Sequence, residues 1–99
     1  MSAPNDVGNA PNAPKKTWAT AFWVANPAKG ELRREQLSSP AQDEVRVHTL
    51  YSGISRGTES LVFNGRVPES EFSRMRAPFQ SGEFPAPVKY GYCSVGRVE

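Results

Sequence analysis

Residues 45–63, VRVHTLYSGISRGTESLVF, change periodicity part-way along, and this change decides how the chain is expected to fold. Up to Tyr51, apolar or β-branched residues alternate with mostly polar ones, which is typical of a half-buried antiparallel strand. The positions expected to be buried are Val45, Val47, Thr49 and Tyr51. From Ser55 a capping hydroxyl precedes Glu59 and an apolar run that ends at Asn-Gly. The stretch therefore predicts a strand, a glycine turn and a short helix over residues 55–63.

The flanking sequence predicts more strands than helices. Residues 17–26 are rich in aromatic and β-favouring side chains and predict a first strand. A turn follows, and a second, exposed strand is expected between Gly30 and Pro40. A helical turn within residues 67–76 and a proline loop then lead to a last strand, in which Gly91 and Gly96 indicate a bulge or a close backbone approach. The predicted fold is mainly β with short helices, a partial β-barrel.

Length and composition allow one small domain. The chain has 99 residues, and residues 1–16 are too polar and proline-rich to pack, so we expect a disordered N-terminal tail. No signal peptide or membrane span is visible, which favours a cytoplasmic location. The net charge of +2 does not indicate binding to nucleic acid or membranes. The strand pattern is still running at Glu99, so the natural polypeptide is expected to continue.

Two side chains that could bind a metal, Cys93 and His48, are each better explained by a structural role. Cys93 is the one cysteine, so it forms no internal disulfide and builds no zinc site alone. We interpret it as a small buried hydrophobe. His48 falls on the polar side of its strand and is interpreted as a surface residue.

Two ordered motifs carry a family resemblance. The first is Gly53-Ile54-Ser55-Arg56, followed by Thr58 and Glu59; the second is PVKYGYCSVG, residues 87–96. Over roughly residues 22–99 the chain resembles the N-terminal GroES-like catalytic domain of the medium-chain dehydrogenase/reductase superfamily, the zinc-type alcohol dehydrogenase-like enzymes. Its "SGISRGTE" is also similar to the branch that contains bacteriochlorophyllide-type dehydrogenases.

The departures from the family pattern concern the metal ligands. Ser55 stands where zinc-dependent members have a cysteine, Tyr92 where they have a histidine, and Cys93 where they have a glutamate. Zinc prefers thiolate, imidazole and carboxylate donors, so a serine hydroxyl and a phenol are poor replacements. The resemblance is therefore to a branch that lacks the zinc ligands, and no catalytic zinc is expected.

The resemblance implies the N-terminal, substrate-side portion of an NAD(P)-dependent, zinc-independent oxidoreductase acting on a small molecule. NAD or NADP would bind mainly to a Rossmann domain that is absent from this chain, so the chain alone is expected to be inactive. The resemblance also admits a homodimer. Tyr92 is the first choice as a hydrogen-bond or proton donor to the substrate, with Ser55 and Thr58 as further catalytic hydroxyls. Arg56 is expected to contact a cofactor phosphate.

Alternatives remain for each residue and for the whole chain. Ser55 fits a helix cap, Glu59 a favourable charge at a helix start, and Tyr92 a core aromatic. Arg56 fits a solvated surface. The chain also fits a stand-alone small β-barrel that binds a partner through solvent-facing aromatic side chains, namely Trp18, Phe22 and Trp23.

Overall fold

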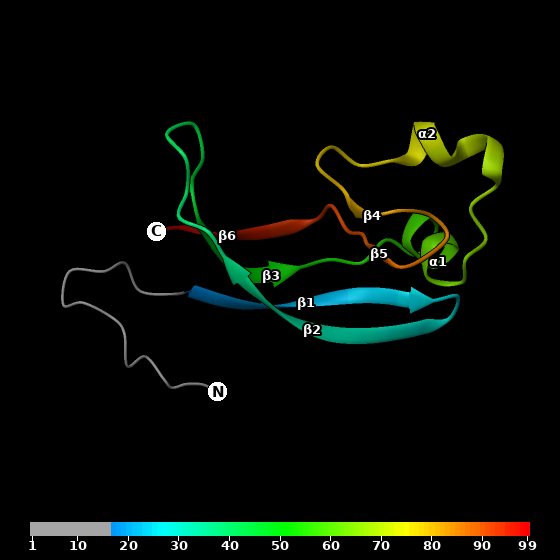
Figure 1. The fold of residues 1–99 in the computed structure, drawn as a ribbon, viewed down its shortest axis with the longest axis horizontal. Coiled ribbons are helices and arrows are strands. Elements are labelled where there is room, and N and C mark those ends of the chain that lie inside the picture. Colours follow the sequence, from blue (N-terminus) through cyan, green and yellow to red (C-terminus); the bar gives the residue numbers. More distant parts are fainter. Residues whose placement is uncertain (1–16) are drawn as a thin grey trace.

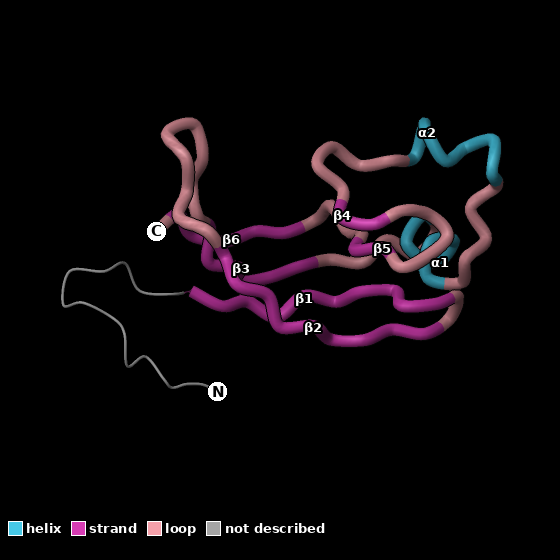
Figure 2. The backbone as a smooth tube through the Cα atoms, viewed as in Figure 1, coloured by secondary structure: helices cyan, strands magenta, loops and turns pink. Residues whose placement is uncertain are grey.

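A computed structural model describes residues 17–99, which form a mainly β structure of two antiparallel sheets with short helices (Figures 1 and 2). One sheet has the strand order β2-β1-β5-β4, and the other pairs β3 with β6. The sheets do not close on each other, so the predicted partial barrel is confirmed as an open, mainly β fold. The predicted disordered tail, residues 1–16, lies outside the described residues.

A long hairpin forms one edge of the larger sheet. Strand β1 (Thr17–Asn26) pairs with β2 (Lys29–Leu37), which confirms both predicted strands. Its turn contains Ala28 at a positive φ of 61°. The Ala28 N–H donates to the Phe63 carbonyl at 2.7 Å, so the turn is attached to the end of the first helix.

Two very short strands complete this sheet. Strand β4 (Ser81–Gly82) pairs with β5 (Val88–Lys89), and Val88 of β5 lies opposite Val24 of β1. A Cβ atom on Gly82 would lie 2.3 Å from the Pro87 carbonyl oxygen, so this close approach requires glycine. Because side chains alternate along a strand, Val88 enters the core while Lys89 faces the opposite side.

The core lies between this sheet and the helical segments. The helical segments are α1 (Thr58–Phe63), a 3₁₀ turn η2 (Glu69–Glu71) and α2 (Phe72–Met75); α1 contributes a buried residue, and α2 packs partly buried side chains against the core. The buried side chains are Val24, Val62, Val67, Phe84 and Val88. Partly buried aromatic side chains extend this cluster from α2 toward β5, since Phe84 packs on both Phe72 and Tyr90 at centroid distances of 5.6 and 5.5 Å.

The second sheet is a two-stranded ribbon that extends away from the helical end (Figure 1). It consists of β3 (Val47–Ser52) and β6 (Ser94–Val98). The strand was predicted correctly, but its predicted buried face was wrong, because every residue of β3 is exposed. Two causes are visible: β3 packs on no second layer among the described residues, and a bulge between Thr49 and Tyr51 interrupts the alternation.

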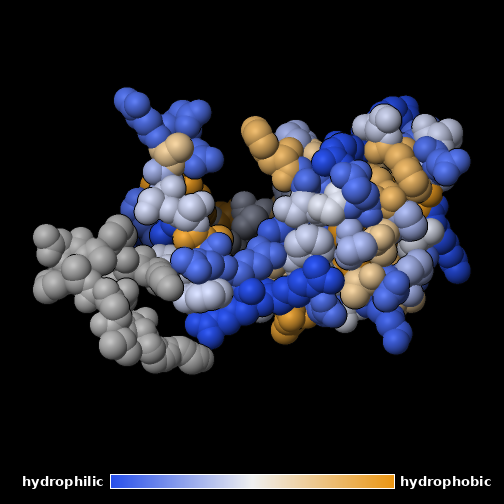
Figure 3. All heavy atoms as spheres, in the orientation of Figure 1, coloured by the Kyte–Doolittle hydropathy of each residue, from blue (hydrophilic) through white to orange (hydrophobic). Residues whose placement is uncertain are grey.

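Apolar side chains consequently reach the surface (Figure 3). Ile54 is 85% exposed, Tyr51 77% and Val98 61%. His48 is exposed as predicted, and Nδ1 of its ring lies 3.7 Å from a Glu99 carboxylate oxygen. In residues 17–99 no helix has the length and apolar character needed to cross a membrane.

A polar clamp crosses the outer face of the larger sheet. Glu35 of β2 accepts hydrogen bonds from the Lys89 ammonium at 2.8 Å and from the Trp23 indole at 2.7 Å. Arg33 covers the Trp23 ring at 4.4 Å from its centroid. The interpretation of Trp23 as a solvent-facing stacking surface is therefore wrong, whereas Trp18 and Phe22 are about half exposed. The clamp joins β2 to β5 across β1.

Glu35→Gln should destabilise the fold at neutral pH but not in acid. Hydrogen bonds from Lys89 and Trp23 hold the pKa of Glu35 below its usual value of 4.5. The folded state therefore takes up this proton less readily than the unfolded chain, so the stabilisation is present above pH 4.5 and lost as the pH falls through the lowered pKa. We expect a loss of about 1 kcal/mol at pH 7 by urea unfolding. Glu69→Gln, an exposed control, should change little; an equal loss at pH 3 would contradict the clamp.

Gly96→Ala should open the β3–β6 ribbon. An added Cβ would lie 2.3 Å from the His48 carbonyl oxygen, which confirms the close backbone approach expected from the sequence. Overpacking of this kind costs about 1–3 kcal/mol, so backbone amides of β3 and β6 should exchange roughly tenfold faster or more. Gly57→Ala is the matched control, since nothing lies within 4 Å of its Cβ position. Unchanged exchange in Gly96→Ala would show that the ribbon adapts.

Candidate functional site

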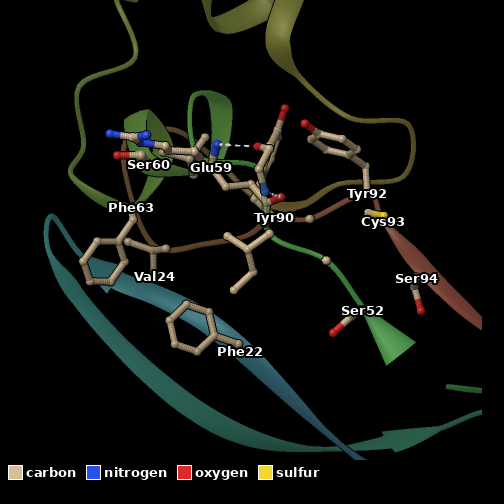
Figure 4. A pocket seen from close by; sticks show the side chains of 16 residues that line it. Phe22, Val24, Ser52, Glu59, Ser60, Phe63, Tyr90, Tyr92, Cys93 and Ser94 are labelled. Carbon is tan, nitrogen blue, oxygen red and sulfur yellow. Dashed lines mark hydrogen bonds between the residues drawn. The ribbon is translucent and has the colours of Figure 1, made fainter. Parts of the chain in front are cut away.

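One large cavity lies where the two sheets and the first helix meet. Its volume is about 670 Å³. The walls come from β1, from residues 52–56 at the end of β3 and after it, from α1, and from residues 90–94, which lead into β6. Phe22 and Phe63 lie on one side of it, and Tyr90 and Tyr92 on the other (Figure 4).

Three of the four residues predicted to act in the site are brought together here. Ser55, Arg56 and Tyr92 all line the cavity, although Tyr92 is far from the other two in sequence. Thr58 does not line it; this residue begins α1 and is partly buried. The structure therefore groups Tyr92 with Ser55 and leaves Thr58 outside.

Ser55 caps the first helix through a reciprocal pair of hydrogen bonds. Its Oγ accepts from the Glu59 N–H at 3.1 Å, and the Glu59 carboxylate accepts from the Ser55 N–H at 2.8 Å. This resembles a capping box in which Gly57 lengthens the usual spacing by one residue. The N-cap residue itself is Gly57, so Ser55 does not occupy the N-cap position, but its hydroxyl does satisfy a free N–H of the first turn, as the capping interpretation expected. The pair also holds the Ser55 hydroxyl and the Glu59 carboxylate at the cavity wall.

Tyr92 and Cys93 are surface residues of the cavity mouth. Tyr92 is 62% exposed, so its interpretation as a core aromatic is wrong. Cys93 is exposed, so its interpretation as a buried hydrophobe is also wrong. The physical reason is local: the chain leaves the sheet after Lys89, and the Cys93 carbonyl accepts from the Gly53 N–H at 2.9 Å. That bond places residues 92–93 beside the loop after β3 instead of in the core.

Sequence reasoning missed Tyr90. Its hydroxyl donates to the Met75 carbonyl at 3.0 Å, and its ring meets Tyr92 edge-on at a centroid distance of 6.5 Å. Burial, together with the neighbouring Tyr92 and Glu59, raises the pKa of Tyr90 above its usual value of 10.0. The hydroxyl therefore stays protonated across the physiological range. The spacing of Tyr90 and Tyr92 by two residues was the available signal, since alternate positions of an extended chain face the same way.

Sequence reasoning also missed the apolar wall. Phe22 stacks on Phe63 with a centroid distance of 6.5 Å and an interplanar angle of 26°. Phe22 had been noted only as a surface aromatic. The two rings are about forty residues apart in the chain, and they meet at the cavity only because β1 packs near α1.

The donor set does not suit zinc. Among residues 17–99 no three His, Cys, Asp or Glu side chains lie close enough together to hold a metal ion. The cavity lining offers only the Cys93 thiol and the Glu59 carboxylate as strong donors. A tetrahedral zinc site takes at least three protein ligands. The lining also contains one cationic side chain, the Arg56 guanidinium.

The described residues form a mainly β structure with a largely apolar cavity, and the chain is similar to a curated protein. The chain is 33% identical over 79 residues to "2-desacetyl-2-hydroxyethyl bacteriochlorophyllide A dehydrogenase" of Cereibacter sphaeroides. The aligned region covers 80% of this chain and 21% of that protein, so the chain spans about a fifth of the relative's length. The similarity fits the resemblance to dehydrogenases. No family model and no solved structure matches the chain.

Ser55→Ala should weaken α1 by removing the acceptor of the Glu59 N–H. Loss of a serine cap costs about 1 kcal/mol, measurable as a lower midpoint of urea unfolding. Ser55→Thr keeps the hydroxyl and should recover most of the stability. If Thr destabilises the chain as much as Ala, the cap does not explain Ser55.

Proposed function

We propose that this chain is the substrate-side portion of an NAD(P)-dependent oxidoreductase that dehydrogenates an alcohol or reduces the matching carbonyl without zinc. The observation that carries the proposal is the cavity, in which Tyr92, Ser55 and Arg56 meet on apolar walls. The similarity to a dehydrogenase over most of the chain supports it. That relative is named for a hydroxyethyl group on a bacteriochlorophyllide, which suggests an alcohol as the reacting group here.

Zinc independence follows from the chemistry of the donors. The two positions where related enzymes carry cysteine and histidine ligands hold Ser55 and Tyr92, which bind zinc poorly when neutral. The Glu59 carboxylate is already engaged by the Ser55 N–H. Hydroxyl donors would then replace a Lewis acid in stabilising charge on the substrate oxygen.

The role of Tyr92 is to hold a proton at the substrate oxygen. Within residues 17–99 its hydroxyl forms no hydrogen bond, and its ring meets the partly buried Tyr90 edge-on. A nicotinamide, when bound, would supply or accept the hydride. Tyr92 donates a hydrogen bond to the oxygen that gains negative charge in the carbonyl-reducing direction, and Ser55 is a second donor nearby.

Arg56 contributes a fixed positive charge to the same cavity. It is exposed and forms no ion pair with any other side chain of residues 17–99. A guanidinium suits the geometry of a phosphate, so we assign Arg56 to a cofactor phosphate. The rest of the cofactor would be held outside this chain.

Tyr92→Phe in the full-length protein should lower kcat by about a hundredfold, the usual effect of removing one positioned proton or hydrogen-bond donor. Initial rates followed by NAD(P)H absorbance over a panel of alcohols and carbonyls measure this. Tyr51→Phe is a matched control, because Tyr51 is 77% exposed and lies outside the cavity. An unchanged rate for Tyr92→Phe would remove Tyr92 from the mechanism, and no NAD(P)-linked turnover with any substrate would count against the oxidoreductase.

A further inference from the structure

We propose that the cavity selects a flat, mostly apolar ring compound that lies against the wall formed by Phe22 and Phe63, rather than a small polar alcohol. The proposal concerns binding by residues 17–99. It rests on the proposed function only where the bound compound is called the substrate.

The size of the cavity excludes a close fit to a small alcohol. Its volume of about 670 Å³ lies within the range of roughly 300–1,000 Å³ that is typical of sites for drug-sized ligands. A two- or three-carbon alcohol would leave most of this space as water against apolar walls. A compound of two or more fused rings would instead remove that water, which is favourable in proportion to the apolar area covered.

Phe22 packs on two neighbours and is still about half exposed. It stacks on Phe63, yet it remains 52% exposed. Its ring also lies against Gly30 of β2, since a Cβ atom on Gly30 would lie 2.4 Å from it. A ring that is already held in place loses little freedom when a ligand stacks on it, which favours binding. Aromatic rings prefer offset-stacked or edge-on partners, so a flat ring fits this face better than a puckered one.

The opposite side of the cavity adds a second aromatic contact and the polar groups. Tyr92 is 62% exposed and lies across from the phenylalanine wall (Figure 4). Ile54 is 85% exposed at the same cavity, a large apolar side chain without cover. The polar groups are a minority of the lining: Glu59 and Ser55 each accept a backbone N–H from the other, Ser52, Ser60 and Ser94 add hydroxyls, and Arg56 is the one cation. The geometry therefore points to a ring system with one oxygen-bearing substituent directed at Tyr92.

Cys93 provides a direct reporter of occupancy. It is the one cysteine in the chain, it is exposed, and it lines the cavity. The rate at which N-ethylmaleimide labels Cys93 in the 99-residue chain would be measured by mass spectrometry with increasing ligand. The probes are 2-naphthalenemethanol, its saturated counterpart decahydro-2-naphthalenemethanol, and propan-2-ol. The first two share a carbon skeleton and a hydroxymethyl group, and differ in flatness and π-electrons.

We expect 2-naphthalenemethanol to protect Cys93 in a saturable way, the saturated alcohol to bind roughly two- to tenfold more weakly, and propan-2-ol to give no protection at the same concentrations. Phe22→Leu keeps an apolar side chain without a ring and should abolish the preference for the flat alcohol. Phe79→Leu is the control, since Phe79 is fully exposed and outside the cavity. If Phe22→Leu fails to fold, nuclear Overhauser contacts from naphthalene protons to Ile54 and Val24 methyl groups in the unmodified chain replace it.

Each outcome decides the proposal. Equal or tighter binding of the saturated alcohol, no protection by either alcohol in a folded chain, or contacts only to residues outside the cavity would overturn it. The measurement contains no cofactor and no turnover, so it is independent of the oxidoreductase assay. Selective binding without NAD(P)-linked turnover rejects only the proposed function. Turnover that favours saturated or small alcohols rejects only the proposal that the cavity selects a flat ring compound.

Discussion

The position of two residues, Val88 and Lys89, determines the arrangement of the site. Val88 is fully buried and lies opposite Val24, so the core holds β5 against β1 from the inside. Lys89 reaches the other face and joins Glu35, so an ion pair holds the same strand from the outside. A strand of two residues has few backbone hydrogen bonds, and it is these two side-chain contacts that anchor it. Tyr90 and Tyr92 follow directly, and their position at the cavity depends on this anchor.

The same residues of the first helix serve stability and the site together. The Ser55–Glu59 pair satisfies one of the free amides, that of Glu59, at the start of a helix of only six residues, which needs such support. At the other end, the Phe63 carbonyl accepts a hydrogen bond from the Ala28 N–H, and the Phe63 ring stacks on Phe22. The helix is therefore attached at both ends to elements that form the cavity. The residues that stabilise its first turn also line the cavity wall.

The chemistry of the lining favours hydrogen bonding. Ser55 and Tyr92 contribute hydroxyls to it, and the nearby Glu59 carboxylate accepts a backbone hydrogen bond. Such a lining can hold protons and orient an oxygen, and it has apolar rings on which a ligand can lie. The similarity to a dehydrogenase agrees with the redox chemistry that we propose for a cavity of this kind.

Local pattern determined much of the fold. The aromatic and β-branched run predicted β1, the serine-to-asparagine stretch predicted α1, and the glycine in the last strand predicted a close backbone approach that Gly96 makes. Ser55, Arg56 and Tyr92 were also predicted to share one site. That prediction came from matching two ordered motifs to a family pattern, since periodicity gives no information on contacts between distant residues.

Tertiary structure alone decided which faces are buried and which rings meet. Alternation along β3 predicted a buried face, but burial requires a second layer, and in residues 17–99 none covers it. Cys93 was expected inside because cysteine is usually buried, but its carbonyl pairs with Gly53 and holds it at the surface. Phe22 and Phe63, like Glu35 and Lys89, are distant in sequence, and their contacts depend on how strands and helix pack. Local sequence determines conformation along the chain, whereas burial and long-range contacts depend on what the rest of the chain places alongside.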